Sequence, residues 1–333
     1  MAEAFLRLSR DDQIEALNVV ATRSGRPPHI LEKDVWVVWA LQALFSSPSA
    51  GSLVFKGGTS LSKAYGVIDR FSEDIDITYD IRELIGDLAG EDDEPIPPND
   101  SQRRKWRKAI EAKLPAWVET EIAPHLRARL EADGLDAQVD AQGDRIWIRH
   151  APTSGGWGYM TPDVMIEFGG RSTGLPVNSV SIGCDAATYL SSLDFPTATP
   201  RVMRAERTFW EKATAVHVFC RQGRLTAERL ARHWYDLVQL DDAGYAERAL
   251  ADRELARHVA EHKASFFPAK GIDYLQAVGG DLRLLPAGDL EGLLRADYAA
   301  MIENGLLGPQ APGFEELMAR CRDLQDRANA SAT

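Results

Sequence analysis

Two blocks decide the fold of this 333-residue chain: Phe55-Lys56-Gly57-Gly58-Thr59-Ser60 and, further on, Ser72-Glu73-Asp74-Ile75-Asp76-Ile77. The short apolar run that ends at Phe55 predicts a strand, and the two glycines after Lys56 predict a turn. TSLSKAYGV favours a short helix, and the alternation of DIDITYD predicts the next strand. This order of strand, glycine turn, helix and Asp-x-Asp strand is more specific than either block alone.

The two acids of the second block, Asp74 and Asp76, carry the predicted chemistry. Residues two apart on a strand face the same side, so both carboxylates project together while Ile75 and Ile77 point into a core. Two carboxylates held close resist simultaneous ionisation unless a cation lies between them. Such oxygen ligands suit Mg²⁺, with Mn²⁺ as an alternative, and these ions stabilise phosphoryl displacements. In another context the same motif would be an ordinary solvent-facing pair on an edge strand.

The glycine turn supplies the other half of a nucleotide site. A strand that ends in two glycines and opens a helix lets backbone N–H groups approach a triphosphate, and the helix dipole favours the anion. The spacing of a P-loop is absent. The predicted nucleotide-binding residues are Lys56, Gly57, Gly58, Thr59 and Ser60, the last two as hydroxyl donors.

A two-metal site commonly needs a third carboxylate from another strand. Glu167 is the candidate, because it is the one acid within the apolar run Val164-Met165-Ile166-Glu167-Phe168. Asp163 is the weaker alternative, since it follows Pro162 and is expected where the strand begins. The plainer interpretation of Glu167 is an acid at the exposed end of a strand.

The rest of the chain divides into an α/β front half and a helical back half. Periodicity predicts helices over residues 11–24, 30–46 and 101–132, and strands over 145–150 and 163–169. Residues 89–100 are acidic and proline-rich, so a surface loop is expected there, and residues 170–200 are expected to hold at most two short strands. From about residue 201 the pattern is mainly helical, with loops at 221–225 and 267–288.

Composition limits the class of protein. The chain is 44% hydrophobic, enough for a sizeable core, and no apolar run approaches the ~20 residues of a membrane span. Cys184, Cys220 and Cys321 are too scattered for a disulfide framework or a zinc cluster, which favours a reducing cytoplasm. The net charge of −12 argues against broad capture of duplex DNA, and it leaves a local basic patch or a basic partner open.

At these residues the chain resembles the AbiEii/AbiGii family of nucleotidyltransferase-like toxins, a branch of the DNA polymerase β-like superfamily. The matching stretches are LEKDVWVVWALQALF (31–45), LVFKGGTSLSKAYGVIDRFSEDIDIT (53–78), VMIEFGGRS (164–172), RAERTFWEKATAVH (204–217) and ARHWYDLVQL (231–240). The resemblance implies an α+β fold. Its nucleotidyltransferase-like mixed β-sheet core, flanked by helices, would span residues 1–200 with a helical insertion around 101–132. A mainly helical C-terminal domain would follow over residues 201–333.

The resemblance also implies a reaction and residue roles. Members of the family transfer a nucleotide from an NTP, and the well-understood ones are toxins that modify tRNA acceptor ends and are encoded beside an antitoxin. The implied roles are metal binding by Asp74 and Asp76, phosphate contacts by Gly58 and Ser60, Glu167 as the third acid, and basic and acidic positions at Lys212 and Asp236. Arg232-His233 stand where many relatives have Arg-Asp, so the acceptor is the least transferable feature.

Lys212 and Asp236 also make physical sense at such a site. An ammonium that reaches the triphosphate would offset the charge that develops on the leaving pyrophosphate. Glu206 lies about 240° around the helix from Lys212, so it is expected to pack or to form a salt bridge instead. Asp236 would orient Lys212 or a nucleophile. The plainer interpretations are a solvated lysine, and an acid that pairs with a structural arginine such as Arg232.

A basic run is the candidate contact for an RNA backbone: Arg103, Arg104, Lys105, Trp106, Arg107 and Lys108. Trp106 would stack on a base. Charge runs on helices are more often solvated faces, so both interpretations stay open. His217 and His233 lack a metal-ligand spacing and are expected to be structural.

Three functions follow from these observations. The first is a metal-dependent nucleotidyltransferase toxin of a toxin–antitoxin or phage-defence system, which transfers NMP from an NTP to an RNA, with the tRNA 3′ end favoured. The second keeps this chemistry but modifies a protein hydroxyl or a small molecule. The third is a non-catalytic module that binds a nucleotide or an antitoxin, ranked last because all three acids are present. The expected partners are an NTP, tRNA or another RNA, and a cognate antitoxin, with no membrane.

Overall fold

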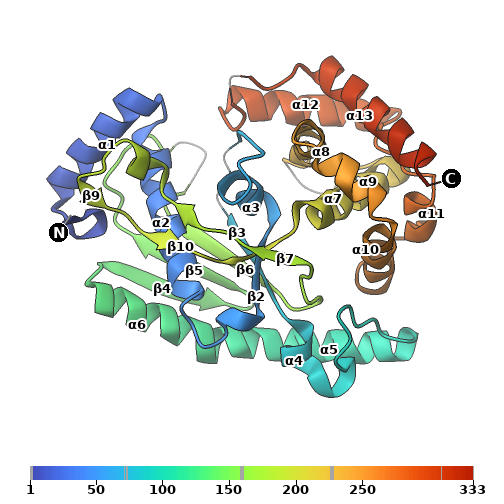
Figure 1. Cartoon of the computed structure of the whole chain (residues 1–333), viewed down its shortest axis with the longest axis horizontal. Helices are drawn as coiled ribbons and strands as arrows, with labels where there is room; N and C mark the ends of the chain where they lie inside the picture. Colours follow the sequence, from blue (N-terminus) through green and yellow to red (C-terminus); the bar gives the residue numbers. More distant parts are fainter. Residues whose placement is uncertain are drawn as a thin grey trace. The chain divides into compact units, whose positions relative to one another are not determined.

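The computed structural model describes residues 3–70, 72, 74–157, 161–225, 229–308 and 310–332. The chain forms two compact units (Figure 1). The first unit comprises Met1–Ala64, Glu73–Asp87 and Lys108–Val202, and the second comprises Tyr65–Ser72, Leu88–Arg107 and Met203–Thr333. The chain therefore passes into the second unit twice before it enters it for the last time at Met203.

The first unit is built around a mixed sheet, which has seven strands in the described residues, in the order β4-β5-β6-β3-β2-β11-β7. The strands are β2 (Leu53–Lys56), β3 (Asp74–Tyr79), β4 (Ala137–Gln142), β5 (Arg145–His150), β6 (Val164–Gly169), β7 (Val177–Ser179) and β11 (Arg201–Met203). β3 runs parallel to β6 and antiparallel to β2, while β5 runs antiparallel to β4 and β6. The predicted mixed sheet is confirmed.

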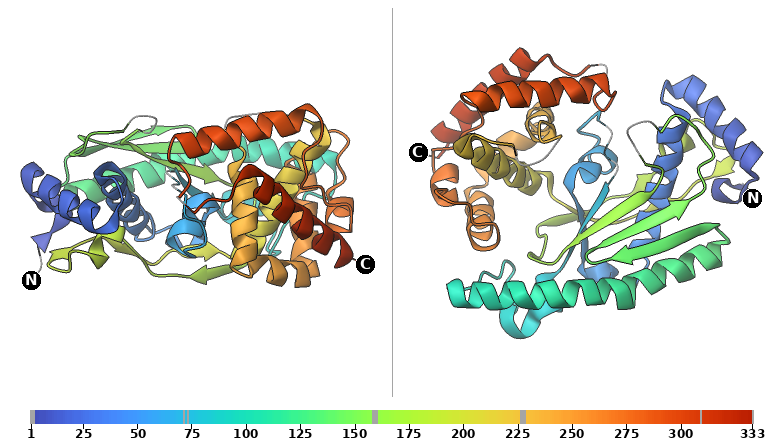
Figure 2. Two further views of the ribbon diagram at one scale, coloured as in Figure 1. Left: turned by 90° about the horizontal axis from the view of Figure 1, so that it is seen from above. Right: turned by 180° about the vertical axis from the view of Figure 1, so that it is seen from behind.

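One face of this sheet forms the core of the first unit. Its side chains are apolar and at most 1% exposed: Phe55, Ile75, Ile77, Ile146, Ile148, Ile166 and Phe168. Two helices, α2 (Pro28–Leu44) and α6 (Ala123–Asp133), pack against each other and cover this face, α2 over β6 and α6 over β4 (Figures 1 and 2). Trp36 of α2 stacks on His150 of β5, with 4.5 Å between the ring centroids. Because side chains alternate along a strand, Asp74 and Asp76 lie on the opposite face.

The remaining elements of the first unit are short, apart from α1 (Arg10–Ser24). They are β1 (Glu3–Ala4), α3 (Gly57–Lys63), α4 (Ile81–Ala89), β8 (Ile182–Gly183), β9 (Leu193–Asp194) and β10 (Thr197–Ala198), with 3₁₀ turns at Phe5–Arg7, Ala50–Ser52 and Asp185–Thr188. Residues 170–200 thus hold four short strands, so the expectation of at most two is wrong. Strands of two or three residues leave no periodicity for a sequence to reveal.

The helix predicted over residues 101–132 is confirmed, with a π-helical interruption. It consists of α5 (Asp100–Trp117), a π turn (Val118–Ile122) and α6. Pro115 and Pro124 lie on either side of the π turn. Each proline removes a backbone donor from the helical ladder, which accounts for a local change of hydrogen-bond spacing between them.

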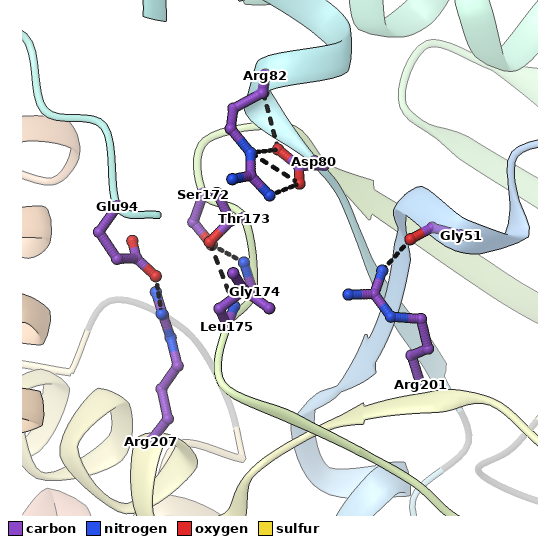
Figure 3. A network of polar contacts seen from close by, with 10 residues as sticks. All are labelled: Gly51, Asp80, Arg82, Glu94, Ser172, Thr173, Gly174, Leu175, Arg201 and Arg207. Atoms are coloured by element: carbon purple, nitrogen blue, oxygen red, sulfur yellow. Dashed lines mark hydrogen bonds and ion pairs between the residues drawn. The ribbon is translucent and has the colours of Figure 1, made fainter. Parts of the chain in front are cut away.

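Polar contacts fix the turn that follows β3 (Figure 3). The Asp80 carboxylate accepts the backbone N–H of Arg82 at 2.9 Å and pairs with the Arg82 guanidinium at 2.7 Å. The backbone N–H of Ile81 donates to the Ser172 carbonyl at 3.2 Å, and the Ser172 hydroxyl accepts the N–H of Gly174 at 3.0 Å. The bond from Ile81 to Ser172 joins the chain that leaves β3 to the chain that leaves β6, and the other bonds fix each of the two turns.

The second unit is mainly helical, as predicted. Its helices are α7 (Ala205–Gln222), α8 (Arg232–Asp242), α9 (Tyr245–Ala251), α10 (Arg253–Phe266), α11 (Tyr274–Val278), α12 (Asp289–Glu303) and α13 (Phe314–Ala330). α7 packs against α8, α9, α10 and α11, and α8 packs against α13. Arg207 of α7, with a side chain only 1% exposed, pairs with Glu94 (Figure 3). No helix of the described segments is both long and apolar enough to cross a membrane.

Candidate active site

The acids of β3 lie as their alternation predicts. Asp74 and Asp76 are partly exposed on one face, while Ile75 and Ile77 between and beside them are 0% exposed on the other. Asp76 is opposite Lys56 of β2 in the antiparallel register and opposite Glu167 of β6 in the parallel register. The two strands that flank β3 therefore bring a cation and a third carboxylate beside Asp76.

Gly57 brings the glycine turn into contact with the Asp76 carboxylate. Its φ is +77°, a conformation that L side chains rarely adopt. A Cβ at this position would overlap the carboxylate group of Asp76. Glycine is therefore required twice at position 57, once for its backbone angle and once for the space that Asp76 occupies.

Glu167 lies in a row of charged residues across four strands. Lys56, Asp76, Glu167 and Arg145 occupy successive cross-strand positions on β2, β3, β6 and β5, and we call them the charged row. Arg145 pairs with Glu167 at 3.0 Å, and their side chains are 47% and 42% exposed. Glu167 is thus an accessible acid in the middle of its strand, not at the exposed end. Asp163, the weaker alternative, precedes β6 and lies 3.6 Å from Arg149.

Arg145 is a member of the charged row that the sequence analysis did not single out. RIWIRH (145–150) alternates polar and apolar residues, and this pattern places Arg145, Trp147 and Arg149 on the face of the acids. This alternation in the sequence was enough to predict that Arg145 lies on the polar face of the sheet. The register that brings Arg145 opposite Glu167 is a property of the β5–β6 pairing.

The hydroxyls of Thr59 and Ser60 already have partners within the protein. Thr59 donates to the carbonyl of Asp74, and Ser60 donates to the carbonyl of Gly57 at 2.9 Å. Both residues are at most 1% exposed. In this arrangement the two hydroxyls hold the glycine turn against β3, and they are not directed outward as phosphate donors.

The donors on this face fit a hard divalent cation. Carboxylate oxygens are the ligands that Mg²⁺ prefers, and it usually binds through one or two carboxylates plus water and substrate phosphates. Among the residues that the structure describes, no group of three or more His, Cys, Asp or Glu side chains is arranged to hold a metal by itself.

Lys212 and Asp236 meet in the second unit. The ammonium of Lys212 lies 2.8 Å from Asp236, and their side chains are 9% and 0% exposed. Arg70 completes the cluster, since its Nε and Nη2 donate to the two oxygens of Asp236 at 2.6 and 2.8 Å. A solvated Lys212 is therefore excluded, and the arginine that pairs with Asp236 is Arg70 rather than Arg232.

Burial and charge shift the pKa values of this cluster. Burial lowers the pKa of Lys212, and the charges of Arg70 and Arg232 lower it further against the raising effect of Asp236. Burial alone would raise the pKa of Asp236, but the charges and hydrogen bonds of Arg70 and Lys212 hold it well below its usual range. Asp236 is thus an obligate anion between two cations.

Glu206 and His217 form contacts within the protein, as their structural interpretation predicts. Glu206 is 5% exposed and pairs with Arg248 at 2.9 Å and Arg204 at 3.3 Å. His217 accepts the backbone N–H of Arg283 at 3.1 Å, and burial lowers its pKa to about 4. Burial also holds the pKa of His233 well below its usual range.

The basic run on α5 is only partly confirmed as a surface. Trp106 is 3% exposed and lies 6.4 Å from Phe266 between ring centroids, so the prediction that it stacks on a base is wrong. Ile110 and Leu114 are buried at the same helical spacing, so Trp106 belongs to the buried face of an amphipathic helix. Arg103 pairs with Asp100 at 2.9 Å. The exposed members of the run are Arg104, Lys105, Arg107 and Lys108.

Comparison with known proteins decides the family. The profile described as nucleotidyl transferase AbiEii toxin, type IV toxin–antitoxin system, matches residues 39–320. The chain belongs to this family. Membership makes it an NTP-dependent nucleotidyltransferase and a toxin of a type IV toxin–antitoxin system.

Two solved structures are similar to this chain over most of its length. The nucleotidyltransferase toxin MenT4 from Mycobacterium tuberculosis H37Rv is 18% identical with a TM-score of 0.49, over 94% of this chain and 89% of MenT4. JHP933 from Helicobacter pylori is 16% identical with a TM-score of 0.43, over 92% of this chain and 94% of JHP933. No curated protein matches the chain.

Proposed function

We propose that this AbiEii family toxin transfers a nucleoside monophosphate from an NTP to the end of an RNA, with the tRNA 3′ end as the favoured acceptor. One observation carries the proposal: the backbone of Gly57 touches the Asp76 carboxylate, and Glu167 lies opposite Asp76 in the charged row. A glycine turn in contact with one member of a carboxylate pair suits phosphoryl transfer, because the turn can bind phosphate where the carboxylates can hold a cation.

The first unit would bind the nucleotide. Asp74 and Asp76 would hold Mg²⁺ or Mn²⁺, with Glu167 as the third acid, and a bound ion would stabilise the charge that develops on the phosphates. The backbone N–H groups of the glycine turn and the ammonium of Lys56 would bind the remaining phosphate oxygens. Because Thr59 and Ser60 bond inward, we assign them to holding the turn.

The reaction forms one P–O bond and breaks another. The acceptor hydroxyl oxygen attacks the α-phosphorus, the bond from the α-phosphorus to the bridging oxygen breaks, and pyrophosphate leaves with that electron pair. Glu167, an accessible acid beside Asp76, accepts the hydroxyl proton. On the sequence resemblance alone, we assign Lys212 to the charge on the leaving pyrophosphate and Asp236 to orienting Lys212.

Features of the chain support an RNA acceptor in the cytoplasm. The exposed cations of α5 offer phosphate contacts, and the face of Glu167 continues onto β5 with Arg145, Trp147 and Arg149. Cys184, Cys220 and Cys321 are free, as in a reducing compartment. Family membership implies a cognate antitoxin, and a role in phage defence is part of the same proposal.

The experiment that tests this function is a transfer assay. Purified protein is incubated with Mg²⁺, each α-³²P-labelled NTP in turn, and total tRNA. We expect label on tRNA from the wild type, and a loss of about 100-fold or more in Asp76→Asn and Asp74→Asn. Asp140→Asn is the matched control, because Asp140 lies on the same sheet face in the cross-strand row of Asp74 but two strands beyond β6.

The outcomes separate the acceptors. Label on tRNA that depends on Asp74 and Asp76 supports the proposal. Label on the protein itself would replace it with modification of a protein hydroxyl. Nucleotide binding without transfer to tRNA, other RNA or protein would contradict an RNA acceptor.

A further inference from the structure

The segment between α3 and β3 contributes a side chain that no role above has used. Residues 65–72 belong to the second unit, although the elements on either side of them belong to the first. The Tyr65 hydroxyl donates to the Met203 carbonyl at 2.9 Å, and the Gly308 N–H donates to the Asp69 carbonyl at 2.8 Å. Arg70 forms a β-bridge with Leu307. The backbone leading to Arg70 and at Arg70 itself is therefore held by contacts of its own before its side chain is considered.

The Arg70 side chain is directed at Asp236. It is 5% exposed, and its planar fork engages both carboxylate oxygens, Nε on Oδ1 at 2.6 Å and Nη2 on Oδ2 at 2.8 Å. Bidentate arginine–carboxylate pairs are both stronger and more directional than single contacts. Asp236 is thus held at a fixed orientation by a residue 166 positions away in the chain.

Lys212 shares the carboxylate with Arg70. Its ammonium lies 2.8 Å from Oδ2, the oxygen that also accepts Nη2 of Arg70. An ammonium has three donors. Among the described residues, Asp236 is the one ion-pair partner of Lys212. Without Arg70, both oxygens of a fully buried carboxylate would be left to Lys212, and the ammonium would be drawn onto them.

We propose that Arg70 is a positioning residue, which occupies both oxygens of Asp236 so that Lys212 keeps donors for a phosphate group. This inference rests on the role proposed for Lys212. Arg70 lies four residues before Asp74 in the sequence. The inference therefore gives the segment that leads into β3 a role in the second unit, where it orients Asp236. Arg70 itself touches no reacting atom in this scheme.

The charged groups around Lys212 determine how the removal of Arg70 would change its pKa. Asp236 and Arg232 of α8 and Arg70 are the charges that act on it, and burial and these cations keep the neighbouring His233 uncharged near neutral pH. Arg70 lowers the pKa of Lys212 as a like charge and as a competitor for Asp236. Its removal should therefore raise the pKa of Lys212.

The test measures Lys212 directly. Competitive labelling of lysine amines with acetic anhydride across a pH series, read by mass spectrometry, gives the titration and the relative reactivity of Lys212. In Arg70→Gln we expect its titration to move up by about one pH unit or more. We also expect its reactivity at neutral pH to fall about tenfold. Arg70→Lys keeps the positive charge but lacks the planar guanidinium, so the titration of Lys212 in this variant should lie between those in the wild type and in Arg70→Gln.

Arg207→Gln is the matched control. Arg207 is also a buried, ion-paired arginine of the second unit, on the same helix as Lys212, and its partners are Glu94 and Glu211. A loss of stability alone would affect both variants, and only the loss of Arg70 should move the titration of Lys212. Folding is checked by circular dichroism, and Arg70→Lys serves if Arg70→Gln does not fold. An unmoved Lys212 titration in a folded Arg70 variant overturns the inference.

Transfer assays on the same variants separate this inference from the proposed function. With an active wild type, we expect kcat to fall about tenfold or more in Arg70→Gln, and KM for the NTP to change less. If Lys212→Met transfers nucleotide as fast as the wild type, the proposed role of Lys212 fails, whatever the labelling shows. If Lys212→Met is inactive but the labelling does not change in Arg70→Gln, the inference alone fails.

Discussion

At the scale of single residues, Gly57 joins backbone geometry to chemistry. Its positive φ turns the chain out of β2, and its missing side chain leaves room for the Asp76 carboxylate. The sequence analysis predicted that the glycine turn and the acid pair act together, because the order of strand, glycine turn, helix and Asp-x-Asp strand links them. The direct contact with Asp76 depends on the pairing of β2 with β3, where Lys56 stands opposite Asp76.

Gly57→Ala should therefore reduce activity out of proportion to its effect on stability. We expect a cost of about 1–2 kcal/mol for the backbone angle. We also expect a fall in nucleotide transfer of about 100-fold, because Asp76 is displaced. Gly143→Ala is the matched control, since Gly143 has a φ of +63° and open space around it. Equal activity losses in the two variants, measured beside urea denaturation, would contradict the steric argument.

Asp236→Asn tests what two buried cations cost when their shared counter-ion is removed. Asp236→Asn leaves Arg70 and Lys212 buried without their counter-ion, and we expect a loss of about 3–5 kcal/mol in the free energy of unfolding at pH 7. Asp242→Asn is the control on the same helix. Asp242 is 51% exposed in its pair with Arg320, and its loss should cost at most about 1 kcal/mol.

The effect of Asp236 should also depend on pH in a definite direction. Its pKa is held far below its usual range in the folded protein, so its contribution is fully present above the unfolded pKa of about 3.9. That contribution is lost as the pH falls through and below this value. The gap in unfolding free energy between wild type and Asp236→Asn should therefore be smaller at pH 3 than at pH 7. An equal difference in unfolding free energy at pH 3 and pH 7 would mean that ionisation of Asp236 does not cause the destabilisation.

At the scale of elements, α2 organises the first unit through three consecutive buried ionisable residues. Glu32 accepts the backbone N–H groups of Thr153 and Ser154 at 2.7 and 2.8 Å, and Lys33 donates to the Thr161 carbonyl at 2.7 Å. Asp34 pairs with Lys63, the last residue of α3, at 2.5 Å. Each charge in this apolar helix therefore holds a different part of the chain in place, α3 and its glycine turn among them.

Glu32→Ala should destabilise the protein by about 2–4 kcal/mol, because two backbone N–H groups and the nearby His150 lose a buried carboxylate partner. Glu15→Ala on the exposed surface of α1 is the control, with an expected change within about 0.5 kcal/mol. Urea denaturation of both variants measures the difference. Equal midpoints would show that Glu32 does not support the chain between β5 and β6.

Elements with strong periodicity could be predicted from the sequence, and weak ones could not. The strands with Asp74 and Glu167 alternate clearly, and the long helix over residues 101–132 is evident from its pattern. β4 was not predicted, because only Val139 of its sequence AQVDAQ is buried and such a polar sequence resembles a loop. Trp106 was misassigned because the charges around it suggested an exposed face, whereas burial of its large ring determines the orientation of the helix.

At the scale of the whole molecule, partners far apart in the sequence could not be predicted. The Asp pair and the glycine turn are local, so composition and spacing were enough to propose them. Arg70 and Asp236 are 166 residues apart, and neither residue type identifies the other. The same limit applies to the assignment of residues 65–72 and 88–107 to the second unit, which follows from contacts rather than from local pattern.

The net charge of −12 limits how the molecule binds RNA. With a few exposed cations on α5 as the candidate contacts, we expect log Kd for RNA to depend on log salt with a slope of about 3 or less. Replacing Arg104, Lys105, Arg107 and Lys108 together by Gln should flatten this slope. Filter binding over a salt series measures it. An unchanged slope would remove this part of α5 from the RNA interface.

The residues that contact the segment before β3 are translated long after that segment, and this order affects when the protein becomes toxic. Asp69 and Arg70 are bonded to Gly308 and Asp236, and these residues leave the ribosome long after the acids of β3. A nascent or prematurely terminated chain therefore contains Asp74 and Asp76 but not the contacts that fix the segment leading to them. We expect such fragments to be harmless to the cell that makes them, so that toxicity begins only after Asp236 and Gly308 have been translated.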